Sequence, residues 1–327
     1  MLQEELEVKV ERSVEILDNI IREMSDRIIG QEKLIKNLMI VLICGQHVLI
    51  EGVPGVAKTL TVKTLSSLVG GGYGRIQFTP DLLPADIIGT QIYSPQHEDF
   101  FPKKGPIFTN IILADEINRS PAKVQSALLE AMEERQVTIG EDTFDLDLPF
   151  MVMATQNPID QDGTYPLPEA QVDRFMMKLI VNYPQKDHEL QILRRRGKKN
   201  IDDSIKPVAS FDDILQISKL IDEIYIDVSL EEYIVDIVQC TRHSDFYDSK
   251  MKDYIDYGVS PRATINLVLA SKANALMSGR TYVIPNDVIE VSKPILRHRL
   301  VLSYEALAKE INSDEIIDSI IKIIPIP

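Results

Sequence analysis

The feature that most constrains this fold is an eight-residue loop, Gly52-Val53-Pro54-Gly55-Val56-Ala57-Lys58-Thr59, set between two patterned segments. An apolar run over residues 47–51 precedes it and predicts a short buried strand. Residues 59–69 follow it with the apolar spacing of a helix. A strand, a glycine-containing loop and a helix in this order predict a phosphate-binding loop.

The residue types within the loop suit a nucleoside triphosphate. Backbone amides and the positive end of the following helix attract phosphates, Lys58 neutralises the outer ones, and Thr59 offers its hydroxyl to Mg²⁺. Ala57 stands where the strict pattern has glycine, and alanine fits there if the backbone needs no positive φ. We therefore expect ATP and Mg²⁺ as cofactors, with residues Gly52 to Leu60 forming the binding segment.

A buried strand that ends in two carboxylates is a second, independent sign of phosphate chemistry. Residues 111–114 are all apolar, and Asp115 and Glu116 follow directly. Phosphoryl transfer depends mostly on positioning and charge stabilisation, so one carboxylate for the metal and one as base are sufficient. We expect Asp115 to hold magnesium and Glu116 to polarise the attacking water. Without the loop, the same pair would indicate a helix N-cap.

A third apolar run, residues 150–155, leads to Asn157 and Pro158. Its amide could hold the water or the terminal phosphate. Taken alone, Asn-Pro is a frequent turn dipeptide. The interpretation as a site residue depends on the other two strand ends.

The fold class follows from how strands and helices alternate. Continuous apolar strands between helical segments predict a parallel sheet covered on both faces, hence an α/β first domain. Past Pro184 the pattern is helical alone. Helices are expected at residues 190–196, 211–224, 230–241, 262–277, 285–296 and 315–323, and near the start of the chain at 4–24 and 31–43. We expect a domain of residues 1–184 and an all-helical domain of residues 185–327.

Composition narrows the choice of partner and compartment. The chain has 50 acidic and 35 basic residues, a formal net charge of −15, which disfavours nucleic acid as a partner. The basic run at residues 194–199 is interpreted as a solvated helix end. The acidic N-terminal segment lacks a signal-peptide core, and no run reaches the roughly 20 apolar residues of a membrane helix. We expect a cytoplasmic protein without a membrane span.

Three longer runs make a family resemblance specific: ADEINRSPAKVQSALLEAMEERQVTI at 114–139, ATQNP at 154–158 and GTYPLPEAQVDRF at 163–175. Together with the loop, Ala57 included, they closely resemble the MoxR family of AAA+ ATPases. The resemblance implies an AAA+ P-loop core with hairpin insertions and a small all-α lid. It also implies the site roles that follow: Lys58 and Thr59 as the Walker A pair, Asp115 and Glu116 as the Walker B pair, and Asn157 as sensor 1.

The resemblance further assigns roles to arginines. Arg174 is similar to the arginine finger that reaches the ATP of a neighbouring subunit, and Arg262 to sensor 2 on the lid. Arginine suits both roles because its charge is permanent and its planar fork binds two phosphate oxygens. From the residues alone, Arg174 would pair with Asp173 or Glu169, and Arg262 would be a charge at a helix start. Arg119 belongs to the same motif and is expected at phosphate or at a subunit interface.

Two insertions are similar to the hairpins of that family, residues 91–108 and residues 136–148. The second has turn residues between alternating runs, which itself predicts a hairpin. Phe100, Phe101 and Phe144 on these insertions either grip a partner at a central pore or hold the hairpins against their own domain. Both interpretations remain open at this point.

The resemblance implies an ATPase that converts ATP and water to ADP and phosphate and assembles with itself, as a hexameric ring. It implies remodelling or activation of a protein partner, such as one with a von Willebrand factor A domain, in metal or cofactor insertion. Two alternatives come from related families: a chelatase motor subunit and a nucleic-acid-dependent motor. The loop alone would also allow a small-molecule kinase.

Overall fold

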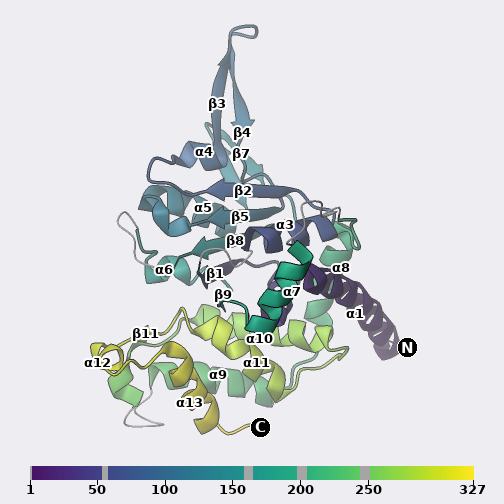
Figure 1. The fold of residues 1–327 in the computed structure, drawn as a ribbon, viewed down its shortest axis with the longest axis vertical. Coiled ribbons are helices and arrows are strands. Elements are labelled where there is room, and N and C mark those ends of the chain that lie inside the picture. The colour runs from purple at the N-terminus through teal and green to yellow at the C-terminus, as the bar shows by residue number, and fades with distance from the viewer. Residues whose placement is uncertain (1, 54–57, 158–164, 197–204, 244–250) are drawn as a thin grey trace. The chain divides into compact units, whose positions relative to one another are not determined.

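The computed structural model describes residues 2–53, 58–157, 165–196, 205–243 and 251–327, whose elements are labelled in Figure 1. The helices are α1 (Leu2–Arg27), α2 (Glu32–Ile43), α3 (Lys58–Leu68), α4 (Pro84–Ile88), η1 (Ile117–Arg119), α5 (Ala122–Glu134), α6 (Glu169–Val172), α7 (Lys186–Arg196), α8 (Phe211–Glu223), α9 (Val228–Arg242), η3 (Met251–Tyr254), α10 (Pro261–Met277), α11 (Pro285–Leu296), α12 (Tyr304–Ala308) and α13 (Ser313–Ile323). The strands are β1 (Val48–Gly52), β2 (Tyr73–Gln77), β3 (Gly89–Ser94), β4 (Asp99–Lys104), β5 (Ile111–Asp115), β6 (Gln136–Ile139), β7 (Asp142–Asp145), β8 (Met151–Gln156), β9 (Met177–Val181), β10 (Ile255–Tyr257) and β11 (Val301–Leu302).

The chain divides into two compact units. The sheet unit comprises Asp18–Arg174 and Leu179–Leu215, and the helical unit comprises Met1–Leu17, Phe175–Lys178 and Gln216–Pro327. Helix α7 therefore groups with the sheet. The domain boundary expected between residues 184 and 185 stays a prediction.

A five-stranded sheet in the order β2-β5-β8-β1-β9 forms the centre of the α/β fold. β2 pairs with β5, β5 with β8 and β8 with β1, all in parallel. The apolar residues of β5 and the first five residues of β8 are buried, as expected for parallel strands covered on both faces. This confirms the predicted α/β class. Since the pairs are parallel and in register, the carboxyl ends of β1, β2, β5 and β8 meet at one edge.

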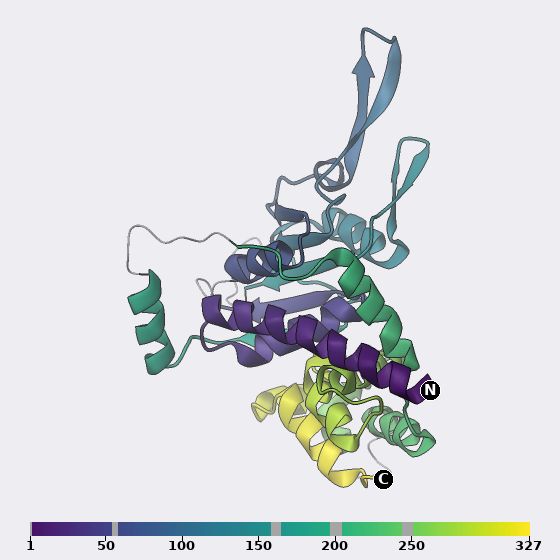
Figure 2. The same cartoon turned by 90° about the vertical axis from the view of Figure 1, so that its right-hand side faces the viewer.

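Two antiparallel hairpins leave the sheet unit, and both predicted insertions are confirmed as hairpins. β3 and β4 pair from Gly89 with Lys104 to Ser94 with Asp99, and β6 pairs with β7. Figures 1 and 2 show both hairpins projecting from the same side of this unit. Gly140, at the turn of the second hairpin, has a positive φ, and a Cβ there would meet the side chain of Gln91 on the first.

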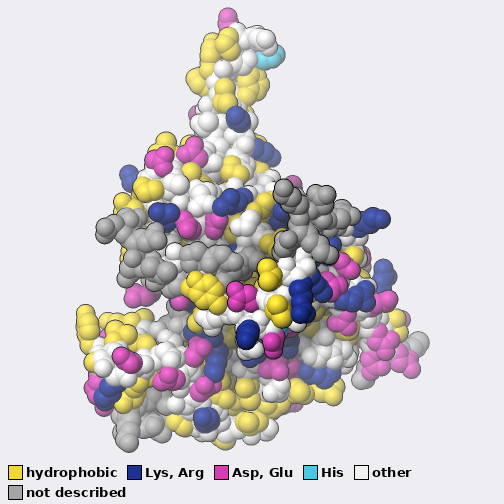
Figure 3. All heavy atoms as spheres, viewed as in Figure 1, with side chains coloured by type: hydrophobic (Ala, Val, Ile, Leu, Met, Phe, Trp, Pro, Cys, Tyr) yellow, Lys and Arg dark blue, Asp and Glu magenta, His cyan; other side chains and the backbone are white. Residues whose placement is uncertain are grey.

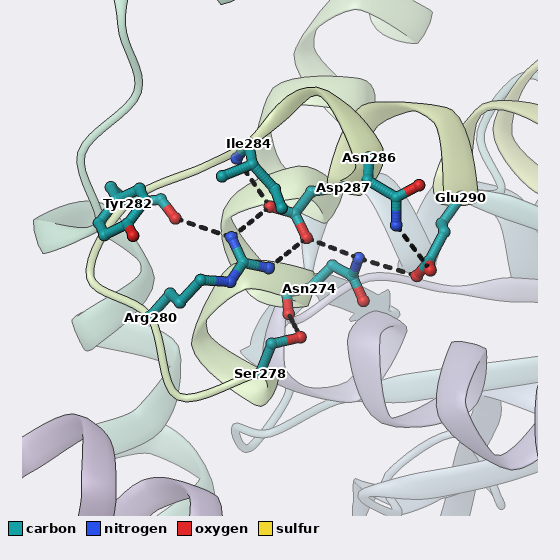
Figure 4. A network of polar contacts seen from close by, with 8 residues as sticks. All are labelled: Asn274, Ser278, Arg280, Tyr282, Ile284, Asn286, Asp287 and Glu290. Atoms are coloured by element: carbon teal, nitrogen blue, oxygen red, sulfur yellow. Dashed lines mark hydrogen bonds and ion pairs between the residues drawn. The ribbon is translucent and has the colours of Figure 1, made fainter.

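The helical unit contains a polar cluster around a buried carboxylate, which we call the Asp287 network (Figure 4). Arg280 binds the Asp287 carboxylate through both terminal nitrogens, each at 2.7 Å. The same carboxylate accepts hydrogen bonds from the backbone N–H of Ile284 and the side-chain amide of Asn274, both at 2.9 Å. Asp287 thus caps the start of α11 and ties it to α10.

The short segment Phe175–Lys178 groups with the helical unit, and two residues that follow the end of α11 bind its carbonyl groups. Arg299, which is buried, donates to the carbonyl oxygens of Phe175 and Met176 at 2.6 and 3.1 Å. His298 Nε2 lies 3.0 Å from the carbonyl oxygen of Phe175. Burial, followed by the charge of Arg299, lowers the pKa of His298 well below its usual value. Neutral His298 therefore fits this contact.

Among the described residues, no helix combines the length and the apolar character needed to cross a membrane.

Candidate functional site

The loop segment is described at both ends. Gly52 is the last residue of β1, Lys58 is the first of α3, and residues 54–57, including Ala57, lie outside the described part of the chain. A Cβ on Gly52 would lie 2.6 Å from the carbonyl oxygen of Val181, so this position accepts only glycine. Thr59 is exposed in the first turn of α3, and Leu60 beside it is half-buried. The unpaired backbone N–H groups of the first turn of α3 and the hydroxyl group of Thr59 therefore lie at the same end of the helix.

Lys58 points back at the strand ends. Its ammonium group donates to the carbonyl oxygen of Gly52 and, at 3.3 Å, to that of Gln156. Burial lowers the pKa of Lys58, and the charges of Asp115, Glu116 and Glu51 oppose that shift. The lysine is thus held by two carbonyl groups in an environment of negative charge, where an anionic phosphate could replace them.

The two predicted carboxylates lie beside β8 and share one threonine. Thr155 Oγ1 donates to Asp115 Oδ1 and accepts from the backbone N–H of Glu116, both at 2.8 Å. Glu116 has φ 57° and ψ 51°, the left-handed region that a non-glycine residue rarely adopts. Such strain persists only where surrounding contacts fix it, and it is concentrated at functional sites. The bond to Thr155 is one such contact.

Three further residues belong to this site and were not predicted from the sequence: Arg75, Gln77 and Thr155. Arg75 Nη2 lies 2.7 Å from Asp115 Oδ2 and 2.6 Å from Gln77 Oε1. Gln77 in turn donates to Glu116 Oε2 at 3.3 Å. The available signal was the alternation along residues 73–78, in which polar residues 75 and 77 flank buried Ile76. It could not be used without knowing that β2 pairs with β5.

Asn157 follows the last residue of β8 directly and is half-buried. Because Gln156 is the register partner of Glu51, Asn157 lies level with Gly52 at the edge of the sheet. The structure therefore brings together Lys58, Asp115, Glu116 and Asn157 at this edge.

Three arginines singled out by the sequence have different surroundings. Arg119 contacts Glu116 at 3.0 Å and is 44% exposed, so it lies at the site. Arg174 donates to the carbonyl oxygen of Leu129 at 2.9 Å and pairs with Glu133 on α5 at 2.7 Å. Its partner is thus neither of the two carboxylates considered from sequence. Arg262 lies half-buried in the first turn of α10, in the helical unit.

The oxygen atoms at this edge of the sheet are suitable ligands for a magnesium ion that binds together with phosphates. Asp115 and Thr59 supply oxygen ligands, which Mg²⁺ prefers, and magnesium in such sites takes its other ligands from water and substrate. Among the described residues, no group of three or more His, Cys, Asp or Glu could hold a metal ion. The Asp115 side chain is 15% exposed and already has a cation, Arg75, at one oxygen. Its position therefore favours positive charge.

The aromatic residues of the hairpins divide into two groups. Phe144 is half-buried, packs edge-on against Phe108 with centroids 6.2 Å apart, and lies beneath the Lys104 ammonium at 5.0 Å. Both contacts join the second insertion to the first. Phe100 and Phe101 are 58% and 45% exposed. Figure 3 shows hydrophobic side chains gathered on the projecting hairpin.

Comparisons with known proteins agree over nearly the whole chain. Residues 47–177 match the ATPase family associated with various cellular activities (AAA), and residues 248–320 match the AAA lid domain. The chaperone MoxR1 of Mycobacterium tuberculosis is 47% identical over 96% of this chain and 83% of its own length. YeaC of Bacillus subtilis is 41% identical over 99% of this chain and 97% of its own. A crystal structure from Cytophaga hutchinsonii superposes with a TM-score of 0.94 at 48% identity, covering 100% of this chain and 99% of the other.

Proposed function

Because the chain belongs to the MoxR family of AAA+ ATPases, we propose that it binds ATP with magnesium and hydrolyses it to ADP and phosphate. One observation carries the proposal: the carboxyl ends of three neighbouring strands bring Lys58, the Asp115–Glu116 pair and Asn157 to one edge of the sheet. Phosphoryl transfer to water needs positive charge at the phosphates, a ligand for the metal and a base for the water. A lysine beside a helix N-terminus and two carboxylates with different surroundings can supply these.

Each residue has a distinct task in this proposal. Lys58 leaves its carbonyl partners for the outer phosphates, where the helix end and loop amides also bind. Thr59 and Asp115 would hold magnesium, which when bound neutralises charge on the phosphates. Glu116 takes a proton from the attacking water, and Asn157 orients that water or the terminal phosphate.

Two substitutions test the assignment. We expect Glu116→Gln to retain nucleotide binding and to lower turnover by about 10²- to 10⁴-fold, the usual contribution of a general base. Lys58→Ala should instead weaken binding itself. Fluorescent ATP-analogue titration and phosphate release separate the two effects. If both variants bound and hydrolysed ATP like the unchanged protein, the site would be wrong.

We extend the proposal to a homo-oligomeric ring, a hexamer, in which Arg174 acts on the ATP of the neighbouring subunit and Arg262 contacts nucleotide from the lid. Membership of the AAA+ family and the half-exposed position of Arg174 support this extension. Mass measurement of the Glu116→Gln protein with and without ATP tests it. Monomers at every protein concentration with ATP present would refute the ring.

The biological task we propose is chaperone-like remodelling or activation of a protein partner in the cytoplasm, with a von Willebrand factor A domain protein and metal or cofactor insertion as the specific form. The name of the Mycobacterium tuberculosis relative and the exposed aromatic residues of the β3–β4 hairpin support it. Affinity capture with Glu116→Gln protein and ATP should retain such a partner, and Phe100→Ser with Phe101→Ser should release it.

ATPase activity stimulated by DNA but by no protein would favour a nucleic-acid motor, and co-purification of a large porphyrin-binding subunit would favour a chelatase.

A further inference from the structure

Arg75 occupies a position that neither the loop nor the carboxylate motif requires. It lies on β2, the strand beside β5, where register places Arg75 opposite Leu113 and Gln77 opposite Asp115. One terminal nitrogen, Nη2, makes both of its polar contacts, with Asp115 Oδ2 and with Gln77 Oε1. The side chain is 47% exposed. The guanidinium thus reaches the metal carboxylate from the solvent side of the sheet edge.

Both oxygens of Asp115 are engaged in this arrangement. Oδ1 accepts from the Thr155 hydroxyl, which also holds the backbone of Glu116, and Oδ2 accepts from Arg75. The Thr155 contact is part of the strand framework, since the threonine is buried in β8. The Arg75 contact comes from a long, half-exposed side chain. An incoming cation therefore has one oxygen of Asp115 to compete for, Oδ2.

We propose that Arg75 is the resident counter-ion of Asp115 and that magnesium must displace it, so that Arg75 raises the magnesium concentration required for nucleotide binding. The inference rests on the proposed function, because it takes Asp115 as the metal carboxylate. Displacement is feasible since a single-nitrogen pair with a half-exposed arginine is weak. Mg²⁺ needs close, near-octahedral oxygen ligands, and the guanidinium at Oδ2 repels it.

The test follows binding of mant-ADP by fluorescence while free Mg²⁺ is varied, so hydrolysis does not enter the measurement. In Arg75→Gln we expect half-saturation at about two- to fivefold lower Mg²⁺, the range set by one exposed ion pair. Arg75→Lys keeps a positive charge near Oδ2 and should remain close to the unchanged protein. Circular dichroism melting confirms that each variant is folded.

Arg119→Gln is the matched control. Arg119 is similarly exposed, at 44%, and pairs with the neighbouring carboxylate, Glu116, at 3.0 Å. The Arg119→Gln substitution removes one positive charge from the site, as Arg75→Gln does, but leaves the contact between Arg75 and Asp115 in place. An equal shift in Arg119→Gln, or no downward shift in Arg75→Gln, would overturn the proposal. Asp115→Asn tests the metal assignment separately from the role of Arg75: if the Mg²⁺ requirement of this variant were unchanged, Asp115 would not be a magnesium ligand.

Discussion

Two arginine–aspartate ion pairs in this chain have the same shortest distance, 2.7 Å, and opposite surroundings. Arg280 binds Asp287 with two nitrogens, and the aspartate side chain is 2% exposed with further bonds to Ile284 and Asn274. Arg75 binds Asp115 with one nitrogen and is itself 47% exposed. The first pair is saturated inside the helical unit, whereas the second can exchange its partner.

This difference separates structural from functional ion pairs more clearly than distance does. Breaking a buried pair leaves an uncompensated charge, whereas an exposed pair contributes about 0–1 kcal/mol. Arg174 with Glu133 belongs to the second group, since its members are 32% and 36% exposed. A pair that costs little to break is available to a ligand or to a neighbouring subunit.

The largest expected effect comes from Arg174. Arg174→Ala should lower ATP turnover by about 10³-fold or more, as loss of an arginine finger does. The thermal midpoint should change little, because only a half-exposed ion pair and one hydrogen bond to a carbonyl group are lost. Phosphate release and calorimetry measure the two. Mixing this variant with Lys58→Ala subunits should restore part of the activity, since an intact loop then meets an intact arginine. Absence of any restoration would contradict action between subunits.

Asp287→Ala should give the largest loss of stability. The substitution leaves Arg280 without its partner and removes the cap from Ile284, so we expect the helical unit to lose about 3–5 kcal/mol in unfolding free energy. Urea unfolding followed by circular dichroism measures it. Nucleotide affinity of the folded protein is the control. A loss below about 1 kcal/mol would place Asp287 with the exchangeable pairs.

The stability of the protein near pH 5 tests a buried group that is neutral and has both of its polar atoms hydrogen-bonded. His47 Nε2 lies 3.1 Å from the carbonyl oxygen of Met132, and Nδ1 accepts from Val152 N–H at 3.0 Å. Burial, with a smaller contribution from Arg135, lowers the pKa of His47 from 6.5 to about 4 despite the Met132 contact. The unfolded chain then binds more protons between these values, so this contribution is complete above pH 6.5 and is lost as pH falls toward 4.

The lost contribution is about 3 kcal/mol for a shift of this size. Urea unfolding at several pH values from 7 to 4.5 measures it. His47→Gln, although less stable at pH 7, should show a flatter dependence, with His298 left as a second, half-buried imidazole that resists protonation. Equal slopes in both proteins would show that His47 does not carry the dependence.

Residues at the ends of strands could be predicted from the sequence, whereas their neighbours on adjacent strands could not. Lys58, Asp115, Glu116 and Asn157 are recognisable because each stands at a fixed offset from an apolar strand, and strand ends of a parallel sheet converge. The hairpins are also local patterns. The neighbours of these residues are lateral: Arg75 reaches Asp115 across 40 positions, and Thr155 reaches Glu116 across 39. Only strand order and register place them.

Arg174 shows the other limit. Its nearest carboxylates in sequence suggested a local pair, but α5 carries Glu133 to within 2.7 Å of it. Helix α5 and the segment before β9 are distant in sequence, so their contact depends on packing in the sheet unit. Its proposed role in a second subunit depends on assembly, which no single-chain pattern specifies.

The smallest expected effect is the loss of stability in Arg75→Gln, which compares the Arg75–Asp115 pair directly with the Arg280–Asp287 pair. Arg75→Gln should change the free energy of unfolding by less than about 1 kcal/mol, because one half-exposed contact is lost and Asp115 keeps Thr155. Arg280→Gln is the matched substitution in the saturated pair and should cost several times more. Urea unfolding of the two variants side by side measures the ratio. If Arg75→Gln proved as damaging as Arg280→Gln, the Arg75 pair would be part of the fold, and magnesium could not displace Arg75 at a cost of about 1 kcal/mol or less.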